Sequence, residues 1–434
     1  MLRVLMAAAI SCCVFLPTVR SEEPSVESLS AKTIGELTAL LGSSDTAERV
    51  EAIDALATRG EGAAEAVPAL LEQLEFDNPY VRAASARALG AIGAEPGKAI
   101  PALIEHFSDK GAIEEFDLSY RVTPLFAIYG TSAAKFGEEA LDPLIEALGS
   151  DSAQVSLAAA VGLEAMGEPS VKAMPLLIKM LESDDTRRRN SAAGVIRGIG
   201  PAAAEAVPAL VKLLDAESFH TQYWTCRALG AIGPASVVAT DDLVGLLTEG
   251  TVSVRRNAAM TLGNIGPEIG PEAVDKLIRV IDEEFTAPVR EEAVVALGKL
   301  KPFAKESVPA LRKALTDPDY PLPTHTARSL WLLTDDPKEA LPTLIKAMDD
   351  LSYFQHAVEV LAEMGPQAAP AVDRLIEALD EPDPDDRASA AYALARIGAP
   401  AGKAKEPLRK LLEAEEEQVR EAGKKALEVL SEAE

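Results

Sequence analysis

The chain repeats one sequence pattern about every 33 residues, and this period limits its possible folds more than any other feature. The segment YVRAASARALGAIG, which ends at Gly93, has close relatives in SVRRNAAMTLGNIG, ending at Gly266, and DRASAAYALARIG, ending at Gly398. Successive copies end near residues 60, 93, 130, 167, 200, 233, 266, 301, 334, 365, 398 and 431. Twelve copies of one unit predict a stack of identical supersecondary elements, because a chain with one large core would show no such period.

Each copy predicts two helices. The first half reads AVPALLEQL at 66–74 and AVPALVKLL at 206–214, with apolar residues at helical spacing. Pro or Asp opens this half, and both suit the first turn of a helix. They are Pro68, Pro101, Pro175, Pro208, Pro309, Pro342, Asp241, Asp275 and Asp373. The second half carries an apolar stripe and ends at a glycine, which is a helix stop.

Four glycines fall inside the predicted second helix. They are Gly90, Gly230, Gly263 and Gly298. Glycine in a helix interior costs about 1 kcal/mol relative to alanine. We therefore expect close backbone contact with a neighbouring helix at these positions.

The combination of AAEAVPAL, a short acidic turn and VRxxAAxALGxIG resembles HEAT repeats, specifically the short HEAT-like type of the phycobilisome lyases. The resemblance covers about residues 32–434 and implies a fold more than a function. We expect an all-α protein in which residues 22–434 form a single right-handed α-solenoid of about twelve HEAT-like hairpins. The second helices should line its concave side.

The resemblance also assigns a role to an arginine near the start of the second helix. It is present as Arg49, Arg82, Arg189, Arg255, Arg290, Arg387 and Arg420. We expect it to pair with acids of the preceding turn, such as Asp77 or Asp184, and to bond carbonyls of the next repeat. This would be a structural ladder. An anion-binding stripe is the alternative, and the acidity of the chain argues against it.

The chain is strongly acidic, with 42 basic and 69 acidic residues and a formal net charge of −27. Such a surface repels phosphate backbones and anionic lipids, so we do not expect nucleic acid as a partner. The charge also keeps a long exposed surface dispersed, and we expect a monomer.

Residues 1–21 predict export. Arg3 precedes an apolar run from Val4 to Leu16, which is too short to cross a bilayer comfortably but fits the apolar part of a signal peptide. Cleavage after Ser21 would release the chain into the periplasm or outside the cell. Lipidation at Cys12 or Cys13 and an untranslocated N-terminus are the alternatives. No other segment is expected to span a membrane.

The sequence contains no recognisable catalytic or metal-binding motif. None of the histidines His106, His220, His325 and His356 is followed by Glu, and no two have metal-ligand spacing. Cys226, the one cysteine left after signal cleavage, lies inside a predicted helix, where we expect a packed side chain. We therefore predict no catalytic site, no metal site and no cofactor.

Aromatic and histidine residues gather where the repeat departs from its pattern. The departures are the long link of repeat 3, from Asp109 to Leu118, and the turns between the two helices of repeats 6, 9 and 10. A regular stack would place these turns along one edge, and such residues anchor protein interfaces. The alternative is that the rings fill gaps in the packing. The predicted protein-binding residues are Phe219, Tyr223, Trp224, Tyr320, His325, Trp331, Tyr353, Phe354 and His356.

These features together predict an exported, non-catalytic scaffold. It would bind an extended protein partner along its concave face or along the edge formed by the turns. Two alternatives remain open. One is a lyase-type subunit that acts on a chromophore or a protein, and the other is a passive spacer in an envelope assembly.

Overall fold

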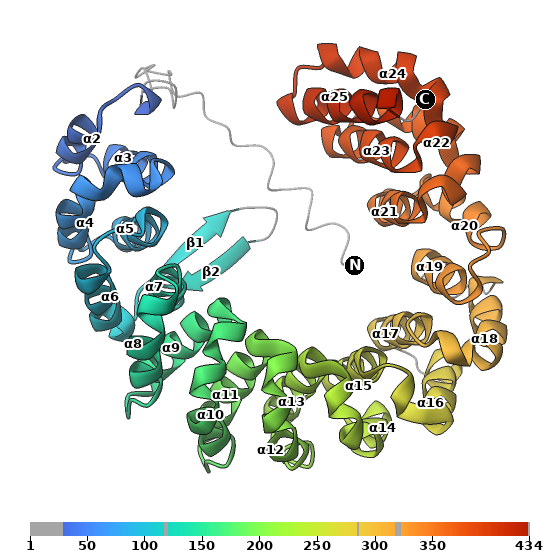
Figure 1. Cartoon of the computed structure of the whole chain (residues 1–434), viewed down its shortest axis with the longest axis horizontal. Coiled ribbons are helices and arrows are strands. Elements are labelled where there is room, and N and C mark those ends of the chain that lie inside the picture. The colour runs from blue at the N-terminus through green and yellow to red at the C-terminus, as the bar shows by residue number, and fades with distance from the viewer. Residues whose placement is uncertain (1–28, 117–119, 284–285, 317–322, 433–434) are drawn as a thin grey trace, which may run out of the picture. The chain divides into compact units, whose positions relative to one another are not determined.

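The computed structural model describes residues 29–116, 120–283, 286–316 and 323–432, except for the side chains of residues 114–122. The predicted signal segment and the predicted binding residue Tyr320 lie outside the described residues. The described chain is built from twelve successive helix pairs (Figure 1), each with a first helix, A, and a second helix, B. This confirms the predicted all-α repeat fold.

The helices follow the predicted repeat along the whole described chain. The A helices are α2 (Ile34–Leu40), α4 (Val67–Gln73), α6 (Pro96–Glu105), α8 (Glu138–Leu148), α10 (Met174–Leu181), α12 (Val207–Val211), α14 (Thr240–Glu249), α16 (Gly270–Glu283), α18 (Ala304–Thr316), α20 (Ala340–Ala347), α22 (Val372–Glu377) and α24 (Lys405–Lys410). The B helices are α3 (Thr46–Thr58), α5 (Pro79–Ile92), α7 (Leu125–Ala134), α9 (Ala153–Met166), α11 (Thr186–Ile199), α13 (Phe219–Ile232), α15 (Val252–Ile265), α17 (Ala287–Gly298), α19 (Pro323–Thr334), α21 (Phe354–Met364), α23 (Pro384–Ile397) and α25 (Glu417–Glu432).

Short 3₁₀ segments connect these helices or extend the A helices. Those that connect a B helix to the next A helix are η1 (Gly60–Ala66), η3 (Glu168–Ala173), η4 (Gly200–Ala206), η5 (Gly233–Ala239), η6 (Pro267–Ile269), η7 (Lys301–Phe303), η8 (Gly365–Ala371) and η10 (Ala399–Ala404). Those that follow an A helix are η2 (His106–Ser108), η9 (Ala378–Asp380) and η11 (Leu411–Glu413). The chain divides into two compact units, Met1–Pro143 and Leu144–Glu434, and the division falls inside α8.

The B helices begin and end at residues that suit helix termini. Asn78, Asp185 and Asp383 each cap a B helix by accepting a backbone N–H two residues later, which satisfies a donor that has no partner within the helix. Most B helices end at a glycine in the left-handed region, for example Gly200 with φ of 70° and Gly233 with φ of 76°. The predicted helix stops are therefore real, because residues other than glycine rarely adopt this conformation.

The prolines of the A helices do not all lie where the sequence predicted. Pro68, Pro175 and Pro208 occupy the first turn as expected. Pro101 and Pro309 instead lie inside α6 and α18, because in these repeats the connecting segment is itself α-helical and begins the helix earlier.

Glycines allow neighbouring B helices to approach closely. A Cβ atom added at Gly263 would lie 2.7 Å from the Cα atom of Ala296 on α17. One added at Gly298 would lie 2.5 Å from the Oγ atom of Ser329 on α19. The expected close contact is confirmed, and it gives these helix-interior glycines a packing function.

Repeat 3 departs from the all-helical pattern. Its A and B helices are joined by an antiparallel hairpin of β1 (Ala112–Phe116) and β2 (Tyr120–Pro124), and Pro124 then serves as the N-cap residue of α7. Asp109 anchors the base of the hairpin. It accepts hydrogen bonds from the Gly111 N–H (2.8 Å), from Arg82 Nε (2.8 Å) and from the hydroxyl of buried Tyr129 (3.0 Å).

Two helical stretches are long and apolar enough, by length and composition alone, to cross a membrane, which the sequence analysis did not expect. They are Thr186–Val211 and Phe219–Glu249. Each is a B helix, a 3₁₀ connection and the following A helix, and each is interrupted by a left-handed glycine at 200 or 233. About half or less of each stretch is buried, 50% and 39% respectively.

Candidate protein-binding surface

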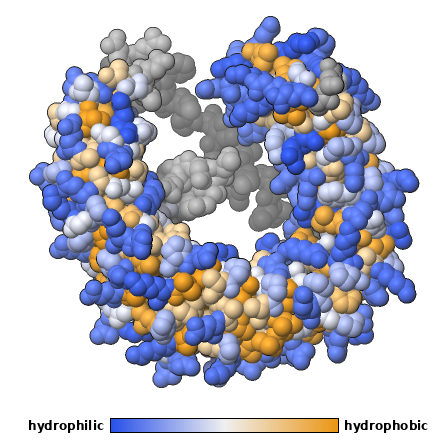
Figure 2. Space-filling model, in the orientation of Figure 1, coloured by the Kyte–Doolittle hydropathy of each residue, from blue (hydrophilic) through white to orange (hydrophobic). Residues whose placement is uncertain are grey.

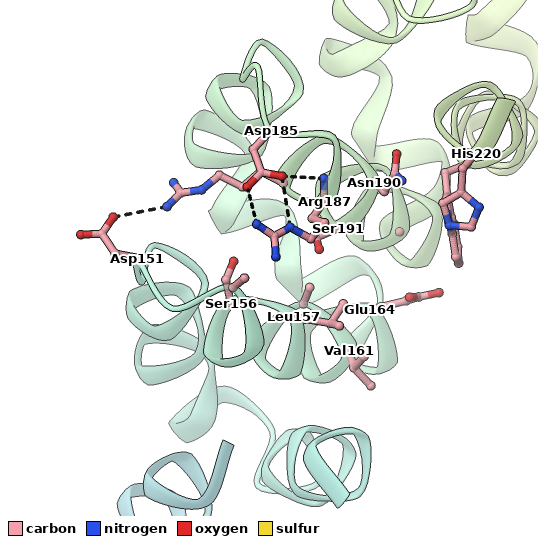
Figure 3. A pocket seen from close by; sticks show the side chains of 15 residues that line it. Asp151, Ser156, Leu157, Val161, Glu164, Asp185, Arg187, Asn190, Ser191 and His220 are labelled. Carbon is pink, nitrogen blue, oxygen red and sulfur yellow. Dashed lines mark hydrogen bonds and ion pairs between the residues drawn. The ribbon is translucent and has the colours of Figure 1, made fainter. Parts of the chain in front are cut away.

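The B helices α9, α11 and α13 line a groove in the C-terminal unit (Figure 3). Its volume is about 390 Å³, within the range of roughly 300–1,000 Å³ typical of ligand pockets. Leu157 and Val161 of α9 lie on one side of the groove, and Arg187 and Ser191 of α11 lie on the other.

Small residues contribute to the lining of the groove. They are Ala153 and Ala160 on α9 and Gly194 on α11. Leu157, a large apolar residue that also lines it, is 39% exposed. Figure 2 shows apolar residues at the surface in this part of the chain, around α11 to α13, among hydrophilic ones. An open apolar lining of this kind is suited to burying a side chain of a partner.

Ion pairs surround the apolar lining. Arg188 reaches Asp151 at 3.3 Å, and Arg187 reaches Asp185, the N-cap residue of α11, at the same distance. At the other end of the groove, Arg197 pairs with Glu164. Burial and the nearby Arg227 lower the pKa of Arg197.

The predicted aromatic residues of repeat 6 lie on α13 beside this groove. Trp224 and His220 line it, and Trp224 Nε1 is 3.3 Å from His220 Nε2. Tyr223 packs edge-on against Trp224 and accepts a hydrogen bond of 2.6 Å from Arg227. Phe219, at the start of α13, is 55% exposed. Except for Phe219, these side chains belong to the face of the B helix and not to the turn, where the sequence analysis placed them.

The predicted residues of repeats 9 and 10 form a second cluster. His325 of α19 stacks on His356 of α21, with ring centroids 4.1 Å apart. The Nε2 atom of His325 is 3.1 Å from the Glu291 carboxylate. Burial, followed by the nearby His356 and Arg328, lowers the pKa of His325 to about 4. The imidazole is therefore neutral near pH 7.

Two further residues of this cluster contribute to packing between repeats. Trp331 donates a hydrogen bond of 2.7 Å from Nε1 to Gln367 in η8, the segment that follows the B helix of the next repeat, and its ring packs against the core. Phe354 is 2% exposed and lies in the core with half-buried Tyr353 beside it. The prediction that Phe354 contacts a partner is wrong, because its ring fills the interior at the position where α21 begins.

The described residues offer little for covalent or metal chemistry. Cys226 is buried, and burial raises the pKa of its thiol to about 12, so the reactive thiolate is scarce at neutral pH. Within the described ranges, no group of three or more His, Cys, Asp or Glu side chains could hold a metal ion.

A family model of HEAT repeats matches residues 20–114, 175–259, 240–331, 308–395 and 342–428, which together include most of the chain. The chain belongs to the HEAT-repeat family. No curated protein matches it significantly.

Solved structures include similar HEAT-type folds. An engineered protein is 23% identical, with 92% of this chain and 99% of that chain covered and a TM-score of 0.32. Kap95p, in a structure concerning its binding to RanGDP, is 13% identical with a TM-score of 0.52. A Kap95:Nup1 complex is 16% identical, with 95% and 66% of the two chains covered and a TM-score of 0.47. The match to Kap95p covers 92% of this chain but 63% of Kap95p, and it supports the fold alone.

The HEAT-repeat arginines bond to different groups from those expected. Arg387 donates from Nη1 to the carbonyls of Glu381 and Pro382, both at 2.9 Å, and from Nη2 to the Glu416 carboxylate of the next repeat at 2.8 Å. Carbonyls five or six residues earlier are also bonded by Arg49, Arg82, Arg189, Arg255 and Arg420. Carbonyls that follow helix A lack helical partners, and the guanidinium fork satisfies two at once.

The contact with the next repeat is made through side chains. The pairs are Arg49–Gln73, Arg82–Asp109, Arg255–Thr286 and Arg387–Glu416. This is the reverse of the expected arrangement, in which the arginines would bond carboxylates of the same repeat and carbonyls of the next.

Proposed function

We propose that this chain is a non-catalytic scaffold that binds another protein on the surface formed by its B helices. The observation that carries the proposal is the groove between α9, α11 and α13, which leaves Leu157 and Trp224 open to a partner. HEAT repeats are used in this way when successive B helices present different side chains to one extended ligand.

A lyase-type subunit is a weaker candidate. The one cysteine of the described chain, Cys226, is buried with a raised thiol pKa, which disfavours covalent attachment of a chromophore. A passive spacer is the other candidate, and it requires no partner in the groove.

Site-specific photo-crosslinking tests the proposal against the spacer. A photoreactive amino acid would replace Leu157 in one variant and Val171, on η3, in a control variant. These two residues are 39% and 41% exposed, so accessibility is matched. We expect a discrete adduct with one partner from the source cell at position 157 and none at 171. The same adducts at both positions, or none at 157, would contradict the proposal.

We also propose that the chain is exported with residues 1–21 as its signal and that it acts as a monomer. N-terminal sequencing of the chain purified from the exported fraction should begin at Glu22, and sedimentation should give the mass of one chain. A chain that keeps Met1 and remains in the cytoplasm would contradict export.

A further inference from the structure

Basic residues are concentrated on neighbouring B helices although the chain as a whole is acidic. Helices α11, α13 and α15 carry seven arginines and no acidic residue. They are Arg187, Arg188, Arg189, Arg197, Arg227, Arg255 and Arg256. The A helices of the same repeats, α10, α12 and α14, carry three acidic residues and one basic residue. Arg189 and Arg255 already bond to carbonyls, and Arg197 and Arg256 pair with Glu164 and Glu292. The basic side chains of these helices that a ligand could engage are therefore Arg187, Arg188 and Arg227.

Some of these arginines can exchange the carboxylates they now pair with for carboxylates of a ligand. Asp151, which pairs with Arg188, is fully exposed, and Arg187 is itself largely exposed. Exposed ion pairs contribute about 0–1 kcal/mol, so a carboxylate from another molecule can replace Asp151 at little cost.

One arginine near the groove has a neutral partner. Arg227 donates to the Tyr223 hydroxyl and lies 5.7 Å from the centre of the Trp224 ring. Arg197, on the neighbouring helix, pairs with Glu164, and its lowered pKa reflects burial and repulsion from Arg227. Two guanidinium groups thus repel one another at this end of the groove, and a carboxylate from a ligand would relieve the repulsion.

We propose that the groove between α9, α11 and α13 binds an acidic, extended segment of a partner protein. One aliphatic or aromatic side chain of the segment enters the groove against Leu157 and Val161. Carboxylates on either side of it meet Arg187 and Arg188 at one end and Arg227 at the other. This proposal rests on the proposed scaffold function and specifies its partner.

Phage display of random twelve-residue peptides on the whole chain tests the inference without assuming a sequence. We expect enriched peptides to be acidic and to share one large apolar residue. A synthetic fluorescent copy of the leading peptide would then be titrated by anisotropy, alongside a copy with Gln for Glu and Asn for Asp. The neutral copy should bind at least about tenfold more weakly, and added salt should weaken the acidic peptide selectively.

Variants locate the binding site. Leu157→Glu, Arg187→Glu and Arg227→Gln should each weaken the acidic peptide about tenfold. Lys338→Glu is the matched control, because Lys338 is 86% exposed and lies in repeat 10. Circular dichroism would show that each variant is folded.

The outcomes separate this inference from the scaffold function. Enrichment of basic or neutral peptides, absence of any enrichment, or equal binding by the wild type and the groove variants would overturn the acidic-ligand inference. The scaffold function would then still be tested separately by the crosslinks at position 157.

Discussion

Replacing Gly263 by alanine tests whether the close approach of neighbouring B helices holds the stack together. The added Cβ would lie 2.7 Å from the Cα atom and 2.8 Å from the Cβ atom of Ala296. Carbon atoms prefer separations of about 3.5–4.0 Å, so α15 and α17 must separate by about 1 Å. Because the opposing atoms are backbone and Cβ, no rotamer change relieves the contact.

The expected effect combines two opposing terms. Overpacking typically costs about 1–3 kcal/mol, whereas alanine favours a helix over glycine by about 1 kcal/mol. We expect Gly263→Ala to lower the free energy of unfolding by about 1–2 kcal/mol, near the upper part of the combined range because the contact is rigid. Gly245→Ala is the control. A Cβ at position 245 in α14 meets no atom within 4 Å, so this variant should gain up to about 1 kcal/mol.

Urea unfolding followed by circular dichroism would measure both variants. Because repeat stacks need not unfold in one step, hydrogen exchange in α15 and α17 would locate the change. Faster exchange in these two helices is expected for Gly263→Ala. If Gly263→Ala proved as stable as Gly245→Ala, the reasoning from close approach would be refuted.

Three further predictions concern charge and burial. The pKa of His325 is about 4 in the folded chain, against an ordinary value of 6.5. The free energy of unfolding should therefore be constant above about pH 6.5 and fall by about 2 kcal/mol toward pH 4, after allowance for partial exposure. His325→Gln should remove this fall when urea unfolding is measured against pH, and a variant with the same pH dependence as the wild type would refute the prediction. Cys226, buried with its thiol pKa near 12, should resist iodoacetamide at about pH 8 until urea unfolds the chain, and rapid labelling of the native chain would contradict this. Arg387→Met should cost about 2 kcal/mol in the same urea assay because the carbonyls of Glu381 and Pro382 lose their donor, whereas a neutral result would show that water replaces the guanidinium.

Most of the fold could be predicted because the repeat period, the terminal glycines and the interior glycines all report local geometry. Gly200 and Gly263 illustrate this, since one ends a helix in the left-handed region and the other meets a neighbouring backbone. The hairpin of repeat 3 could not be predicted in the same way. It depends on the bonds from Asp109 to Arg82 and Tyr129, which join residues far apart in sequence.

The groove was missed because the sequence analysis looked for aromatic residues in turns. The available signal was weak. Leu157 stands where three other copies hold Asn190, Arg256 and Glu291, but the same position also holds buried Ala83 and Thr324, so the pattern alone does not predict that the leucine is exposed. Phe354 shows the opposite error, since an aromatic residue beside a turn proved to be core.

The arginine contacts between repeats give the stack a direction. Arg82, Arg255 and Arg387 each reach forward to a side chain of the following repeat, so a repeat is completed by its C-terminal neighbour. If repeats are deleted from the C-terminus so that one of these three arginines lies in the last repeat, that arginine loses its side-chain partner. Deletion from the N-terminus leaves the partner of every remaining arginine in place. During synthesis, the repeats that carry Arg82, Arg255 and Arg387 gain these bonds only after the next repeat has emerged from the ribosome.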